Sequence, residues 1–151
     1  MHLNFVPILA SLFGFASLAS AQLQLFCPDA LRLGTFAFSP RTVNPGATFT
    51  IVANMTCANY LGYTPTYLDY YIEDTANNNG HEYPTLIARR TYNQSADPPL
   101  DIFTAVLPSG FWFAGAEYQL YMYNSYARTA PAGDTVILVG AVAESINITG
   151  Y

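Results

Sequence analysis

The stretch that decides the fold is Pro45-Gly46-Ala47-Thr48-Phe49-Thr50-Ile51-Val52-Ala53-Asn54-Met55. A Pro-Gly turn signal leads into a strict alternation of apolar and polar residues. One face carries Ala47, Phe49, Ile51, Ala53 and Met55, and the other carries Thr48, Thr50, Val52 and Asn54. Because side chains of a β-strand point alternately to opposite faces, this segment predicts a strand that buries one face in a core.

Strand-like segments recur along the rest of the chain and are separated by turn-forming residues. They cover residues 33–38, 66–74, 84–92, 101–107, 117–124 and 135–148. Asn77-Asn78-Asn79-Gly80 is a reversal signal, the proline at 84 is typical of an edge strand, and Gly140 is a candidate bulge. The pattern predicts an all-β fold, an antiparallel β-sandwich of about seven strands, with no helix after residue 21.

The N-terminal segment has the features of an export signal. Residues 2–21 are mostly apolar and end in Ala19-Ser20-Ala21, a pattern of small residues that signal peptidase cuts. The apolar part covers about 14 residues, fewer than the about 20 that a membrane-spanning helix needs. We therefore predict a signal peptide at 1–21, one domain at 22–151 without a membrane span, and a secreted product, extracellular or in the cell wall.

Charge excludes one class of partner. The net charge is −5, and all five basic residues are arginines, of which only Arg89 and Arg90 are adjacent. Nucleic-acid binding requires clustered positive charge, so no nucleic-acid partner is expected. The two adjacent arginines are interpreted as a solvated surface pair.

Two cysteines and three glycosylation patterns fit an oxidising, extracellular setting. Cys27 and Cys57 are predicted to form a disulfide, with two free buried thiols as the alternative. The acceptor asparagines are Asn54, Asn93 and Asn147, each followed two residues later by Thr or Ser. Continuing the strand pattern past Met55 places Cys57 on the inner face and Asn54 on the outer one.

Three of these segments together resemble a known family. The proline-ended first strand, the Pro45–Val52 segment and Ala116-Glu117-Tyr118-Gln119-Leu120-Tyr121 resemble an immunoglobulin-like or fibronectin type III-like sandwich. The resemblance is strongest to small secreted fungal proteins with an immunoglobulin-like domain of the cell-wall glucan synthesis type. It implies an extracellular interaction module without catalytic residues, in which Tyr118 makes a tyrosine-corner hydrogen bond. The disulfide between the second and sixth strands is missing, because Cys27 precedes the first strand.

No catalytic residues, metal site or cofactor are predicted. After residue 21 the chain has one histidine, His81, in the predicted Asn-Gly turn, and two thiolates with one histidine do not complete a metal shell. We therefore predict that the chain is not an enzyme. The alternative is a small secreted carbohydrate-active hydrolase that uses a carboxylate pair. Asp69 and Glu73 share a strand face about 13 Å apart, and Asp101 with Glu117 is a possible cross-strand pair.

Tyrosines provide the candidate ligand-binding surface. Tyr67 and Tyr71 are expected to project from one strand, and Tyr121 and Tyr123 from another. Exposed rings of this kind commonly hold sugars, although tyrosines also cover the flanks of sandwiches. The predicted function is a secreted, non-catalytic glycoprotein that binds a cell-wall polysaccharide or an extracellular protein such as a host protein. A homodimer through the tyrosine face or an edge strand is an open option.

Overall fold

The computed structural model describes residues 26–76 and 83–150. The predicted signal peptide, the Asn77–Gly80 turn and His81 lie outside the described residues. The helical elements are η1 (Asp29–Leu31), a 3-10 turn, and α1 (Thr56–Tyr60). The strands are β1 (Thr35–Ser39), β2 (Thr42–Val43), β3 (Thr48–Asn54), β4 (Pro65–Asp74), β5 (Thr85–Thr91), β6 (Leu100–Val106), β7 (Tyr118–Thr129), β8 (Thr135–Ser145) and β9 (Asn147–Ile148).

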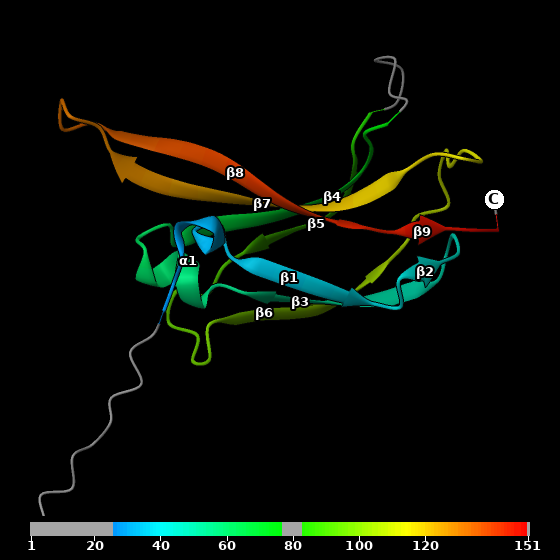
Figure 1. The fold of residues 1–151 in the computed structure, drawn as a ribbon, viewed down its shortest axis with the longest axis horizontal. Coiled ribbons are helices and arrows are strands. Elements are labelled where there is room, and N and C mark those ends of the chain that lie inside the picture. The colour runs from blue at the N-terminus through cyan, green and yellow to red at the C-terminus, as the bar shows by residue number, and fades with distance from the viewer. Residues whose placement is uncertain (1–25, 77–82, 151) are drawn as a thin grey trace, which may run out of the picture.

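Two antiparallel sheets face each other and confirm the predicted sandwich (Figure 1). The smaller sheet has the order β1-β3-β6, and the larger sheet has the order β5-β4-β7-β8. A short parallel pair, β2 with β9, lies at one end. In the described part of the chain, seven strands have five or more residues, which matches the predicted number. This strand order is that of an immunoglobulin-like sandwich.

The deciding segment forms β3 as its alternation predicts. Phe49, Ile51 and Ala53 are buried between the sheets. The strand is preceded by a tight turn in which the Ala47 N–H donates to the Asn44 carbonyl at 2.9 Å. Gly46 has a φ of +81°, which glycine adopts readily at the third position of a type II turn. The Pro-Gly pair therefore sets where the strand starts.

The core is filled from both sheets by the inward rows of the alternation. Its largest fully buried side chains include Phe49, Ile51, Met55, Leu68, Tyr70, Ile72, Leu107, Leu120 and Met122. Before β7, the backbone N–H of Phe113 donates to the Tyr118 hydroxyl oxygen at 2.9 Å, and the Trp112 ring stands perpendicular to the Tyr118 ring. This is the hydrogen bond to nearby upstream backbone that the resemblance implies for Tyr118.

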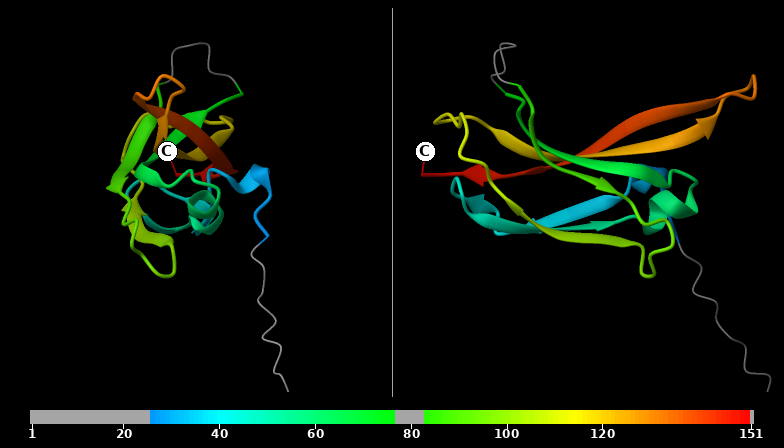
Figure 2. Two further views of the ribbon diagram at one scale, coloured as in Figure 1. Left: turned by 90° about the vertical axis from the view of Figure 1, so that its left-hand side faces the viewer. Right: turned by 180° about the vertical axis from the view of Figure 1, so that it is seen from behind.

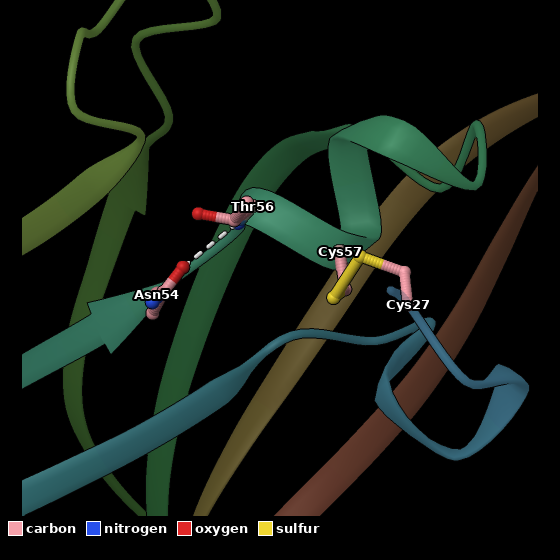
Figure 3. Close-up of a disulfide and its surroundings, with 4 residues drawn as sticks. All are labelled: Cys27, Asn54, Thr56 and Cys57. Atoms are coloured by element: carbon pink, nitrogen blue, oxygen red, sulfur yellow. Dashed lines mark hydrogen bonds between the residues drawn. A yellow bond between two sulfur atoms is a disulfide. The ribbon is translucent and has the colours of Figure 1, made fainter. Parts of the chain in front are cut away.

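The disulfide between Cys27 and Cys57 is present, but its setting differs from the prediction. The two Cα atoms lie 5.2 Å apart. Cys57 belongs to α1 and not to the strand, because the Asn54 side-chain oxygen accepts a hydrogen bond from the Thr56 N–H at 2.9 Å and turns the chain out of β3 (Figure 3). The expectation of no helix is thus wrong at this point. The disulfide is half-buried and joins the segment before η1 to α1.

Gly140 does not mark a bulge. It pairs in regular register with Asn124, and a Cβ added to it would lie 2.7 Å from a methyl carbon of Leu33. Glycine therefore allows Leu33 to pack directly on β8. Register irregularities lie instead in β4, between Tyr70 and Tyr71 where it pairs with β5 and between Pro65 and Tyr67 where it pairs with β7. The predicted final strand is also divided, because β8 ends before the buried Ile146 and β9 then pairs with β2.

Arg89 is 63% exposed at its side chain, as expected, but Arg89 and Arg90 do not act as a surface pair. As neighbours on a strand they point to opposite faces, and each meets a buried carboxylate, Asp69 or Asp101. Arg90 lies on β5 and Asp101 on β6, so their ion pair joins the two sheets. Asp101 also accepts a hydrogen bond from the Tyr70 hydroxyl at 3.2 Å. Over the described ranges, no helix is long and apolar enough to cross a membrane.

Candidate functional site: a tyrosine-lined groove beside an open sheet edge

Three of the four predicted tyrosines meet on the outer face of the larger sheet. Tyr71 and Tyr121 are direct cross-strand partners on β4 and β7. The rings of Tyr71 and Tyr123 stand at 89° with centroids 5.6 Å apart, and Tyr121 stacks on Tyr123 at 5.8 Å. Tyr67 lies on the same face opposite Ser125 and is 45% exposed. The alternation predicted that these tyrosines project outward, and the pairing of β4 with β7 brings three of them together, with Tyr67 at the margin.

A groove of about 570 Å³ runs beside the cluster. Its lining consists of Asp69, Tyr71, Glu73, Tyr83, Pro84, Arg89, Tyr123, Ser125 and Val139. Tyr83 and Pro84 come from the connection before β5, Arg89 from β5 itself, and Val139 from β8. None of these four residues was predicted to lie near the tyrosines, because their approach depends on strand order and not on the pattern within one strand.

The charged groups of the groove are held by specific hydrogen bonds. The Arg89 Nε and Nη2 donate to the two carboxylate oxygens of Asp69, each at 2.7 Å. These bonds and the carboxylate charge raise the pKa of Arg89. The Tyr123 hydroxyl donates to Glu73 Oε1 at 2.7 Å. Two carboxylates and one guanidinium give the groove a net charge of about −1 at neutral pH.

Two tyrosine hydroxyls in the fold have raised pKa values. Burial raises the pKa of Tyr70, with further contributions from the charge of Asp101 and the hydrogen bond to it. Burial also raises the pKa of Tyr123, together with its hydrogen bond to Glu73. Both groups therefore retain their protons in the folded chain at a pH where an unfolded tyrosine, with a pKa of about 10, loses its own.

This difference predicts a loss of stability in alkali. Because the folded state binds more protons than the unfolded state above the unfolded pKa, the contribution of these two tyrosines to the free energy of unfolding should be constant below about pH 10 and fall as the pH rises beyond it. Urea unfolding at a series of alkaline pH values measures this slope. Tyr70→Phe should make the decline shallower, and an unchanged slope in that variant would contradict the assignment to Tyr70.

The carboxylate pairs considered for a hydrolase are engaged in other contacts. Asp101 lies between the sheets, bound by Arg90 and Tyr70, whereas Glu117 is exposed and lines a second groove with Arg41. Asp69 and Glu73 do line one groove, each with its own partner. Within residues 26–76 and 83–150, no group of three or more His, Cys, Asp or Glu side chains is placed to hold a metal ion.

The three predicted glycosylation asparagines are all exposed. Asn54 and Asn93 each accept a hydrogen bond from the backbone N–H two residues later, at 2.9 and 3.0 Å. The Asn147 side-chain amide donates to the Thr42 hydroxyl at 3.2 Å. Exposure is what a glycan requires, and occupancy at these residues stays a prediction.

An open sheet edge lies next to the groove. β8 is the outer strand of the larger sheet, and its segment Val136-Ile137-Leu138-Val139 is exposed on both faces, by 39%, 59%, 43% and 60% in that order. The pairs from Ala127 with Ile137 to Thr129 with Thr135 lie beyond the last pair between β4 and β7, at Pro65 and Tyr126. The β7–β8 hairpin thus projects past α1 as a two-stranded ribbon (Figures 1 and 2).

The chain was compared with family models, curated proteins and solved structures. No family model matches the chain, and no curated protein matches it. Among solved structures, the superoxide reductase (neelaredoxin) of Ignicoccus hospitalis and a substituted form of that reductase are similar, each at 12% identity with a TM-score of 0.43. Each alignment covers 76% of this chain and 80% of the reductase chain.

These neighbours correct the function expected from the sequence. They are enzymes, so the prediction of a non-catalytic binding module is contradicted, and we withdraw it. We also withdraw its hydrolase alternative, because the candidate carboxylates are engaged in other contacts. At this TM-score the likeness assigns no reaction and no metal to this chain. The expectation that the chain is not an enzyme stays a prediction.

Proposed function

We propose that this chain is a self-assembling protein in which β8 of one copy pairs with β8 of a second copy. The observation that carries the proposal is the exposed apolar edge at Val136–Val139. An edge strand presents unpaired N–H and C=O groups, and a second strand satisfies them. A two-stranded ribbon alone is marginally stable in water, so the projecting hairpin gains most from such pairing.

The edge lacks the features that keep edge strands apart. From Thr135 to Ala143 the strand has no charged residue and no proline. Soluble proteins usually protect an edge of this length with lysine, proline or a bulge, and β8 has a regular register throughout. An antiparallel pair of identical strands is self-complementary, which favours a second copy of this chain as the occupant.

Charge also favours one register for the pair. Asp134 precedes the apolar stretch and Glu144 follows it. A two-fold axis at Val139 would place these two carboxylates opposite each other, whereas an axis at Ile137 places Asp134 opposite Gly140. Because like charges directly across a sheet are destabilising, we expect the axis to lie near Ile137. The pairing would join two four-stranded sheets into one.

The setting of this assembly is also part of the proposal. The disulfide and the exposed asparagines support an exported, glycosylated product. Enzymatic removal of N-glycans followed by mass spectrometry tests the glycosylation. The cell-wall location, the polysaccharide or extracellular-protein partner and the resemblance to secreted fungal proteins stay predictions.

Light scattering of the purified chain tests the assembly, and we expect a mass of two copies. Ile137→Lys should weaken the dimer by roughly tenfold or more, since each 1.4 kcal/mol is a factor of ten and the change removes apolar contact and adds like charges from both copies. A monomeric wild-type chain at high concentration would overturn the proposal.

Ile102→Lys is the matched control. Ile102 lies on β6, the edge strand of the smaller sheet, and is 56% exposed against 59% for Ile137. Both variants replace an isoleucine of similar exposure by lysine. They differ mainly in which sheet edge carries the new charge. A dimer weakened equally by both variants would contradict pairing through β8.

A further inference from the structure

The groove on the larger sheet combines aromatic faces with a carboxylate. Tyr71 and Tyr123 stand perpendicular to each other and form a corner, and Tyr83 and Pro84 line the same groove. Tyr121 stacks on Tyr123. The Tyr123 ring is therefore held from two sides, by this stacking and by the hydrogen bond of its hydroxyl to Glu73. The aromatic corner is therefore already formed before any ligand binds.

The charges of the groove are unevenly distributed. Arg89 donates to both oxygens of Asp69, so that these two groups neutralise each other at one side. Glu73 remains as the unbalanced charge, beside the tyrosine corner. Its Oε1 accepts from Tyr123, and its second oxygen has no hydrogen-bond partner among the described residues. The groove is therefore lined by tyrosine rings and by one unbalanced negative charge.

We propose that this groove binds an organic cation, such as a quaternary ammonium group, against the rings of Tyr71, Tyr83 and Tyr123 with Glu73 as its counter-ion. Tyrosine faces carry partial negative charge and attract cations within about 6 Å of the ring centre. The volume of about 570 Å³ is within the range of small-molecule sites and admits a choline-sized group.

The same arrangement disfavours other ligand classes. An anion would meet the charge of Glu73 and gain no hydrogen bond from the Arg89 Nε and Nη2, which already donate to Asp69. A neutral ligand of the same shape would contact the rings but gain nothing from the carboxylate. The net charge of the chain, −5, adds a long-range attraction for cations. Cation binding in this groove does not require pairing through β8.

Calorimetric titration with choline and with its uncharged isostere, 3,3-dimethylbutan-1-ol, tests the proposal. We expect choline to bind in the millimolar range or tighter and the isostere roughly 5- to 30-fold more weakly, because cation–π and ion-pair interactions of about 1 to 2 kcal/mol in total apply to choline alone. Choline that does not bind, or an isostere that binds equally well, would overturn the proposal.

Two variants locate the site, and one controls for charge. Glu73→Gln keeps an oxygen that accepts from Tyr123 and removes the charge, so it should weaken choline and leave the isostere unchanged. Tyr71→Leu should weaken both ligands. Glu117→Gln makes the same change at an exposed carboxylate outside the groove and should leave choline binding unchanged. Choline affinity that Glu73→Gln does not alter, or that Glu117→Gln lowers equally, would place the ligand elsewhere.

Discussion

Replacing both Cys27 and Cys57 by serine is expected to lower the free energy of unfolding by about 3 to 4 kcal/mol. The disulfide closes a loop with a sequence separation of 30 residues and so removes many conformations from the unfolded chain. It also holds the segment before η1 against α1, which has five residues and would be marginal alone. For a domain with a typical stability of about 5 to 15 kcal/mol, the loss is large.

Chemical denaturation of the oxidised and double-serine chains measures this difference. The double-alanine variant is the control for the serine hydroxyls, and it should give the same loss, since the cysteines are half-buried. The wild-type chain with a reducing agent should approach both variants. A loss below about 1 kcal/mol in the variants would mean that the closed loop adds little to this fold.

Asp101→Ala is expected to destabilise the sandwich by about 2 kcal/mol or more. The change leaves the buried Tyr70 hydroxyl without its acceptor and separates Arg90 from its partner. Arg90 is 36% exposed and regains water, so the cost should fall below that of breaking a fully buried ion pair. Arg90 also lies over the Phe103 ring at 4.3 Å, and this packing should loosen as well.

A double-mutant cycle with Tyr70→Phe separates the two contacts of Asp101. If the hydrogen bond contributes, Asp101→Ala should cost less in the phenylalanine background than in the wild type. Asp29→Ala is the matched control, because Asp29 forms an exposed ion pair with Arg32 and is 76% exposed at its side chain. That variant should change stability by less than about 1 kcal/mol. Equal losses from both aspartate variants would contradict a structural role for the buried pair.

The sandwich could be predicted because the sequence patterns that specify its strands and turns each lie within a short segment. Alternation within β3, β4 and β7 separates buried from exposed positions, and turn residues such as Pro45-Gly46 set where strands start. The same local rule placed Tyr71, Tyr121 and Tyr123 on an outer face. Their meeting followed once β4 and β7 paired, and Tyr67 remained at the margin because it lies farther along β4.

The remaining features depend on contacts between distant segments. The sequence does not distinguish Arg89 from Arg90. Their partners, Asp69 for Arg89 and Asp101 for Arg90, are determined by strand pairing and by the packing of the two sheets. Gly140 is required by Leu33, which is distant in the chain. Tyr83 enters the groove from a connection that has no periodic pattern. The function expected from the sequence was wrong, because exposed tyrosines indicate an aromatic surface but do not identify its ligand or its activity.

The parallel pair of β2 and β9 has a mechanical consequence. Asn147 and Thr149 donate backbone hydrogen bonds to Arg41 and Val43, and these bonds run across the strands. The described N-terminal segment, drawn in blue, and α1 lie toward one end of the long axis, and β9 lies toward the other (Figure 1). A tensile load along that axis therefore pulls on these bonds together, in shear, and not one after another as in unzipping.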